Sequence, residues 1–372
     1  MRNPFILKAL PPDRPFCDRT AELEELTGHA RGGVDVVLSS PRRYGKTSLV
    51  FRVLAQLQDE GFLTIYTSFD QVDSSESAAK TLAQGIAAAI QRNEKGLDKA
   101  IRWAKNVLTS FQPAVTIDQD GNPVFTVAPK QGASGLELLE QTMQDLETMA
   151  SKLDEKVVLV FDEFQEVTRL PNSEGVEGLL RTRVQTQLFS HFFVGSRRSV
   201  LEAMFTNRGR PFFKSALMMS LPPLPLDELA GYFKALFADG KDCPDDVAEF
   251  LAFRSKGYGF YAQQLGFYAF SLADKAATLE EAQRAYALVV EQAAPGFEMV
   301  VSSLTLNQIK LLKALATAPS REMTGGEYLA RHGLVASNVA YARKGLVEQD
   351  LIEKGPDGNW RLTDPFFAEW LI

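Results

Sequence analysis

At 372 residues, the chain is longer than a single hydrophobic core usually supports, so we expect two or three domains. Its 45% hydrophobic and 23% charged residues are typical of a soluble globular protein. A formal net charge of -7 argues against a protein that coats nucleic acid or anionic membranes by bulk electrostatics, although it does not exclude a local basic patch.

Cysteines and histidines are too few and too scattered for a disulfide framework or a structural zinc site. Cys17 and Cys243 are the only cysteines, and the three histidines do not cluster. No apolar run is long enough to span a bilayer, and residues 1–15 lack the apolar core of a signal peptide. We therefore expect a cytoplasmic protein without a membrane segment.

The N-terminal residues 3–18 are rich in proline, and a helix is predicted to follow them and to end near residue 30. Asp18 or Thr20 is expected to cap the start of that helix.

A strand, a tight loop and a helix are predicted between residues 34 and 60. Residues 34–38 are apolar and rich in β-branched side chains, and the apolar residues after Thr47 follow helical spacing. This is the context of a phosphate-binding loop, in which backbone N–H groups and a helix N-terminus hold a polyphosphate. The loop residues predicted to bind nucleotide are Ser40, Pro41, Arg42, Arg43, Tyr44, Gly45, Lys46, Thr47 and Ser48.

Within this loop, Lys46 is expected to reach the β- and γ-phosphates of ATP, and the Thr47 hydroxyl is expected to bind Mg²⁺. The usual pattern G-x-x-x-x-G-K-[ST] has one departure, because Ser40 replaces the first glycine. A small serine can often adopt the turn that this position needs. The alternative interpretation is a basic surface turn between a strand and a helix.

A second strand is predicted over residues 62–70 and a helix over 74–93. The resulting β-α-β-α order predicts a mostly parallel sheet with helices on both faces. Residues 95–135 interrupt this order with a predicted hairpin, whose strands 114–117 and 124–127 flank an Asp-Gly turn. A structural flap is favoured over a substrate clamp for this insertion.

An acidic pair, Asp162 and Glu163, follows the apolar run at 157–161 after a predicted helix over 134–153. In an open α/β sheet, this carboxyl edge is where ligands bind. Asp162 is expected to hold Mg²⁺ through its water shell, and Glu163 to orient the attacking water. Such a pair is weak evidence alone, but it is strong evidence in combination with the phosphate loop.

A further strand is predicted over residues 190–195, and Arg197 and Arg198 follow it. These cations are expected beside the γ-phosphate, where they would sense it or stabilise developing charge. The alternative is that both are solvated loop charges. Arg208 and Arg210 are weaker candidates for the same role.

Prolines at 222–225 mark the end of the sheet domain, so we expect a core over 1–220 and a helical domain over 221–302. Residues 303–372 predict a winged helix-turn-helix, with helices at 306–316, 324–332 and 336–349 and a closing hairpin. This region carries eight basic and eight acidic residues, which is weak support for DNA binding. A protein partner is the competing interpretation. A small patch is predicted from Ser337, Asn338, Tyr341, Arg343, Lys344 and Lys354.

Five motifs together resemble the archaeal-type ATPase family of Bacteria and Archaea, in the STAND branch of the AAA+-like P-loop superfamily. They are F-C-D-R-T-A-E-L at 16–23, P-R-R-Y-G-K-T-S-L at 41–49, V-F-D-E-F-Q at 160–165, F-V-G-S-R-R at 193–198 and D-P-F-F-A-E-W at 364–370.

The resemblance implies that Phe16 and Arg19 lie near adenine and that the polar residue ending the 193–198 strand acts as a sensor. It further implies an ATP-driven switch that moves a helical lid and a winged helix. One family element, G-x-P in the helical region, is absent because residues 258–263 contain no proline.

The leading hypothesis is therefore a Mg²⁺-dependent ATPase switch. A DNA-binding regulator with structural nucleotide and a protein-interaction scaffold are the alternatives. An arginine supplied to the site by a second copy of the chain would require a homo-oligomer. The sequence does not decide whether one forms.

Overall fold

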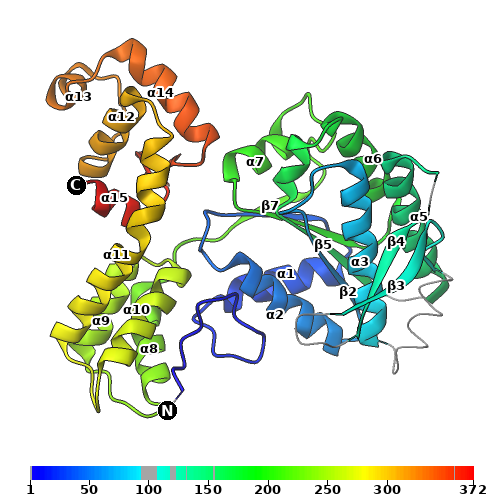
Figure 1. Ribbon diagram of the computed structural model, residues 1–372, viewed down its shortest axis with the longest axis horizontal. Coiled ribbons are helices and arrows are strands. Elements are labelled where there is room, and N and C mark those ends of the chain that lie inside the picture. Colours follow the sequence, from blue (N-terminus) through cyan, green and yellow to red (C-terminus); the bar gives the residue numbers. More distant parts are fainter. Residues whose placement is uncertain (1, 94–106, 118–122, 131, 154–155, 356) are drawn as a thin grey trace. The chain divides into compact units, whose positions relative to one another are not determined.

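The computed structural model describes residues 2–93, 107–117, 123–130, 132–153, 156–355 and 357–372 (Figure 1). These residues divide into two compact units. Residues 19–40 and 46–221 form one, the α/β unit, whereas residues 1–18, 41–45 and 222–372 form the other, the helical unit. The three-domain division proposed from the sequence stays a prediction.

The α/β unit contains a parallel sheet, as predicted. Among the described residues its five strands follow the order β2-β5-β6-β1-β7. The strands are β1 (Val36–Ser39), β2 (Leu63–Ser68), β5 (Val157–Asp162), β6 (Ser190–Gly195) and β7 (Leu217–Ser220). The sequence analysis did not predict β7, an edge strand of four residues that lies directly before the proline cluster.

In the described residues, the helices of the α/β unit alternate with its strands, as expected. They are α1 (Thr20–Arg31), α2 (Lys46–Asp59), α3 (Ser75–Asn93), α5 (Gly135–Leu153), the 3₁₀ helix η1 (Phe164–Arg169), α6 (Ser173–Thr186) and α7 (Arg198–Thr206). The predicted cap of α1 is wrong. Arg19 holds the cap position with a left-handed backbone, and its side chain makes no capping hydrogen bond.

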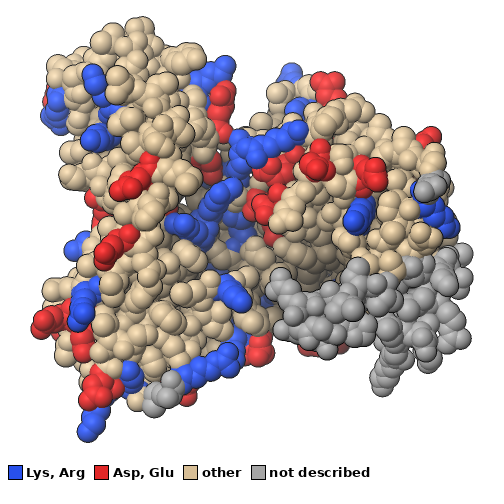
Figure 2. All heavy atoms as spheres, viewed as in Figure 1, with Lys and Arg blue, Asp and Glu red and all other residues tan. Residues whose placement is uncertain are grey.

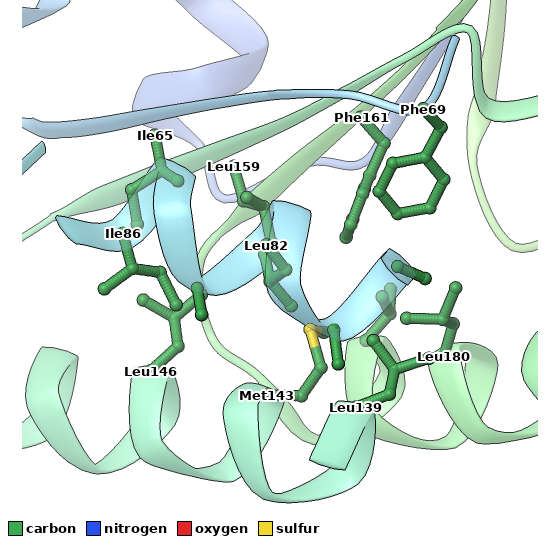
Figure 3. Packing of buried hydrophobic residues seen from close by; sticks show 14 of the residues in the cluster. Ile65, Phe69, Leu82, Ile86, Leu139, Met143, Leu146, Leu159, Phe161 and Leu180 are labelled. Carbon is green, nitrogen blue, oxygen red and sulfur yellow. The ribbon is translucent and has the colours of Figure 1, made fainter. Parts of the chain in front are cut away.

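Apart from the edge strand β7, the sheet of the α/β unit is buried on both faces, which is characteristic of parallel sheets. One face turns Ile65, Leu159 and Phe161 toward α3, and α5 packs on the far side of that helix (Figure 3). The alternate residues Val158 and Val160 are fully buried as well. Because side chains alternate along a strand, apolar residues at successive positions require cover on both sides.

The predicted hairpin forms from β3 (Phe111–Ile117) and β4 (Pro123–Pro129), which pair antiparallel with Ala114 opposite Thr126. Its turn at 118–122 and residues 95–106 and 131 of the proposed insertion lie outside the described residues. The flap role stays a prediction.

In the described part of the helical unit, four helices of 11 to 24 residues precede a winged helix, in the predicted order. Asp364 caps one further helix at the end, α15, which the sequence analysis did not predict. The helices and strands are α8 (Leu226–Phe237), α9 (Asp245–Ser255), α10 (Gly259–Leu272), α11 (Leu279–Ser302), α12 (Leu306–Thr317), α13 (Gly326–His332), α14 (Ala336–Glu348), β8 (Ile352–Lys354), β9 (Trp360–Leu362) and α15 (Pro365–Leu371).

The N-terminal segment belongs to the helical unit through Phe5. The ring of this residue packs against Phe233, Phe237 and Phe270 of α8 and α10. Within the described ranges, no helix combines the length and hydropathy needed to cross a bilayer.

Leu82→Ala should lower the free energy of unfolding of the α/β unit by about 3 kcal/mol, because it leaves a cavity between the sheet and α5. Leu82 is fully buried, whereas Leu188 is 98% exposed, so Leu188→Ala is the matched control and should change stability little. Urea unfolding followed by circular dichroism measures both. Equal effects of the two changes would contradict this account of the core.

Candidate functional site

The predicted phosphate loop follows β1, and α2 begins at its lysine. Lys46 is buried, and its Nζ donates a hydrogen bond of 2.7 Å to the backbone oxygen of Ser40. Gly45 has φ 93°, a backbone conformation that disfavours any side chain. The buried Ser40 Oγ has no hydrogen-bond partner among the described residues. The hydrogen bond to the Ser40 backbone oxygen thus folds the Lys46 ammonium group back over the start of the loop.

Asp162 ends β5 and gathers donors from two other elements. Its Oδ2 accepts hydrogen bonds from Thr47 Oγ1 of α2 at 3.2 Å and from the Tyr66 hydroxyl of β2 at 2.6 Å. Its Oδ1 accepts from the backbone N–H of Glu163 at 2.9 Å. Burial raises the pKa of Asp162, and the hydrogen bond from Tyr66 opposes that rise. The sequence-predicted pair Thr47 and Asp162 is thus brought into direct contact.

Tyr66 is a site residue that the sequence analysis missed. β2 and β5 pair in parallel with Tyr66 beside Val160, which sets the tyrosine hydroxyl near the end of β5. Burial raises the pKa of Tyr66, so the hydroxyl stays protonated and acts as a donor. Tyr66 is the middle residue of the strand predicted over 62–70, so its position gave no signal of this contact, and strand order cannot be read from spacing alone.

Glu163 adopts a left-handed backbone with φ 53° and is held by two side chains. Its Oε2 accepts from Ser196 Oγ at 2.9 Å, at the end of β6, and from Gln165 Nε2. A Cβ atom placed on Gly195 would lie 2.1 Å from Gln165 Oε1, so a side chain at this position would require the Gln165 amide to shift. Gln165 therefore lies tightly between the acidic pair and β6.

The four candidate arginines have different surroundings. Arg198 Nε donates to Glu202 at 2.8 Å, and Glu202 also accepts from Ser39 Oγ at the end of β1. Arg197 precedes α7 and is half-buried.

The two weaker candidates lie beyond α7. Arg208 is exposed. Arg210 forms an ion pair with Glu177, a residue of α6 that is 1% exposed. Burial raises the pKa of Glu177, and the charge of Arg210 opposes that rise. Arg210 thus offsets the charge of a buried carboxylate.

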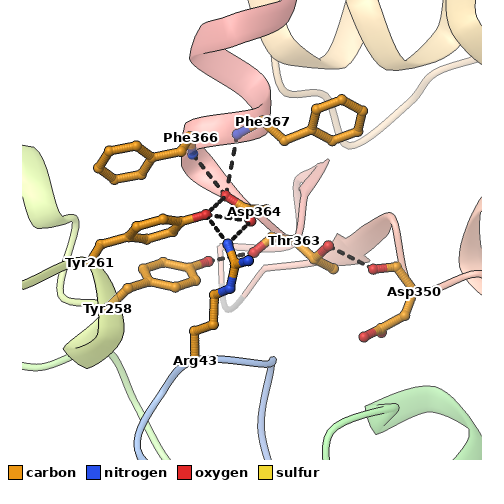
Figure 4. Close-up of polar contacts among 8 residues, drawn as sticks. All are labelled: Arg43, Tyr258, Tyr261, Asp350, Thr363, Asp364, Phe366 and Phe367. Carbon is orange, nitrogen blue, oxygen red and sulfur yellow. Dashed lines mark hydrogen bonds and ion pairs between the residues drawn. The ribbon is translucent and has the colours of Figure 1, made fainter. Parts of the chain in front are cut away.

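Two further residues predicted to bind nucleotide, Arg19 and Arg43, form ion pairs within the protein. Arg19 is buried and pairs with Glu22 of α1 at 2.7 Å. In the helical unit, Arg43 contacts Tyr261 and Asp364 (Figure 4). Of the other residues predicted to contact nucleotide, Pro41, Tyr44 and Ser48 are buried, Phe16 and Gly45 are half-buried, and Arg42 is exposed.

Comparison with known proteins adds two family matches. A model described as an ATPase domain predominantly from Archaea matches residues 16–221, and a model of a probable winged helix domain matches residues 295–372. No match was found among curated proteins.

Several solved structures share the fold. The chain is similar to the Walker-type ATPase PABY2304 of Pyrococcus abyssi, with a TM-score of 0.71, 16% identity, and 98% of this chain and 99% of that chain covered. It is also similar to the ORC2 protein of Aeropyrum pernix in ADPNP–ADP complexes, with a TM-score of 0.61, 16% identity, and 100% and 96% covered. A third is the Aeropyrum pernix ORC1 protein in complex with DNA, with a TM-score of 0.53, 16% identity, and 98% and 93% covered.

At such identities the structural likeness shows the fold alone, that of a P-loop NTPase with a helical region and a winged helix. The family model, in contrast, spans more than half of the chain. The protein therefore belongs to the family of ATPase domains found predominantly in Archaea, joined here to a winged helix domain.

Proposed function

We propose that this protein binds ATP with Mg²⁺ and hydrolyses it slowly, as a conformational switch of the STAND and AAA+-like type. The observation that carries the proposal is the hydrogen bond between Thr47 and Asp162, two residues predicted independently to share one metal ion. The ORC2 structure named above contains ADPNP and ADP, which supports nucleotide as the ligand of this fold. A cytoplasmic location is part of the same proposal.

The residues around the loop fit a nucleotide with its metal. Lys46 would move from the Ser40 carbonyl to the β- and γ-phosphates, and the unpartnered Ser40 hydroxyl would gain an acceptor. Thr47 and Asp162 would hold Mg²⁺, which usually keeps several waters and takes one or two protein ligands.

Glu163 is the proposed base that orients the attacking water. The bonds from Ser196 and Gln165 fix its carboxylate at the carboxyl edge of the sheet. A fixed acceptor of this kind accelerates water attack by removing reorientation from the activation step. Arg197 and Arg198 would stabilise charge on the γ-phosphate.

The other predicted contacts complete the proposal. Phe16 and Arg19 would lie near adenine, and residues 40–48 would cradle the phosphates through backbone N–H groups. The core over 1–220, the lid over 221–302 and the winged helix over 303–372 would move relative to one another with nucleotide state. A trans-acting arginine would make the active form a homo-oligomer.

Lys46→Ala should weaken ATP binding by about tenfold or more, because it removes a charge-assisted bond to phosphate. Glu163→Gln should retain ATP binding and lower turnover by a factor of about 10² or more. Isothermal titration calorimetry and phosphate release measure the two effects. Lys80→Ala and Glu174→Gln change exposed residues of α3 and α6 and should behave as wild type. Wild-type turnover in Glu163→Gln would remove this residue from the mechanism.

Asp162→Asn should raise the Mg²⁺ concentration for half-maximal turnover by about tenfold, because a neutral amide is a weaker partner for the hydrated cation. A Mg²⁺ titration at saturating ATP measures the change. Asp70→Asn, an exposed carboxylate soon after β2, is the control. An unchanged Mg²⁺ requirement in Asp162→Asn would contradict the proposed metal role.

A second candidate function is duplex DNA binding through α14, the third helix of the winged helix. Tyr341 is 80% exposed, and the Arg343 guanidinium lies 5.7 Å from the Trp360 ring of β9, which joins helix and wing into one surface. The ORC1 neighbour is described in complex with DNA. On the face shown in Figure 2, however, basic side chains of the winged helix form separate small groups rather than one patch.

Arg343→Ala and Lys344→Ala should each weaken duplex binding by about threefold and reduce its salt dependence, because each removes one phosphate contact. Fluorescence anisotropy at several salt concentrations measures both quantities. Arg331→Ala on α13, where the arginine pairs with Glu327, is the control. Binding that is unaffected by either α14 change would favour a protein partner, to be sought by copurification.

A further inference from the structure

Side chains of α10 and of the residue before α15 hold Arg43 of the loop (Figure 4). Arg43 Nη1 donates to the Tyr261 hydroxyl and, at 3.0 Å, to Asp364 Oδ2. The guanidinium also lies over the rings of Phe260 and Tyr261, at 5.0 and 5.1 Å from their centroids. An arginine of the loop predicted to bind nucleotide is thus occupied by a carboxylate and two aromatic rings.

The backbone of the same loop segment is held as well. The Phe260 N–H donates to Arg43 O at 3.1 Å, and the Tyr44 ring meets Tyr258 edge-on at 4.6 Å. Arg43 has a left-handed backbone with φ 72°, which a residue with a side chain keeps only when its surroundings compensate. These contacts supply that compensation.

Asp364 also caps the last helix of the winged helix domain. Its Oδ1 accepts from the N–H groups of Phe366 and Phe367, at 3.0 and 3.2 Å, and so caps α15. It also accepts from the Tyr261 hydroxyl, whose ring stacks on Phe366 with centroids 3.8 Å apart. One carboxylate therefore starts the last helix and binds the loop arginine.

We propose that Asp364 competes with nucleotide phosphate for Arg43, so that the winged helix domain holds the loop in a state of low nucleotide affinity. This inference rests on the proposed function. Carboxylate and phosphate are both favoured partners of guanidinium, and Arg43 lies only three residues before Lys46. By linkage, a contact that weakens nucleotide binding is itself weakened when nucleotide binds. ATP would therefore release Asp364 and loosen α15.

Asp364→Asn is the decisive variant because asparagine keeps the size and the capping oxygen but loses the charge. We expect the Kd for Mg²⁺-ATP, measured by isothermal titration calorimetry, to fall by about fivefold. Glu369→Gln is the matched control, since this carboxylate of α15 pairs with Arg254 and Lys256 instead. Its Kd should equal that of wild type. Circular dichroism verifies that both variants are folded.

Hydrogen–deuterium exchange gives a second measurement on unmodified protein. Adding Mg²⁺-ATP should speed exchange at the amides of Phe366 and Phe367, with a smaller change in Asp364→Asn. If wild type and Asp364→Asn bind ATP equally and these amides are unaffected, the competition is overturned and the proposed function stands. If wild type, Asp364→Asn and Glu369→Gln all fail to bind ATP, both proposals fail.

Discussion

The buried carboxylate of Asp162 is the constraint on which the site depends. Burial penalises its charged form, so the group needs donors on both oxygens. Those donors come from α2, from β2 and from the backbone that continues into Glu163. These hydrogen bonds form only when β2 pairs beside β5 and α2 begins at Lys46. The buried carboxylate therefore links the strand order, the start of α2 and the acidic pair of Asp162 and Glu163.

Local patterns made much of this fold predictable. The apolar run at 157–161 and the glycine and lysine of the loop identify their elements because buried strands and phosphate loops need those residue types. Tyr66 was not predictable as a partner of Asp162, since that contact depends on strand order, which spacing does not encode. β7 was missed because four residues carry too little pattern. The start of α15 is encoded locally, by the cap residue Asp364 directly before Pro365, and that signal was overlooked.

Several cations that the sequence assigned to an anionic ligand already have carboxylate partners within the protein. Arg198 pairs with Glu202, Arg210 with Glu177 and Arg43 with Asp364. Arg198 and Arg210 are half-buried and need an acceptor, and in the absence of a phosphate an acidic side chain supplies it, as Asp364 does for the exposed Arg43. Sequence patterns show where a cation lies along the chain, but not which anion holds it, because the acids come from other elements.

The close fit of Gln165 against Gly195 has a consequence for how these sites diverge in evolution. A side chain at position 195 would require the Gln165 amide to move or to be lost, and either change disturbs one of the two groups that hold Glu163. The two positions should therefore vary together among related proteins. A relative with a bulkier residue at 195 would then hold its glutamate through the serine at position 196 alone.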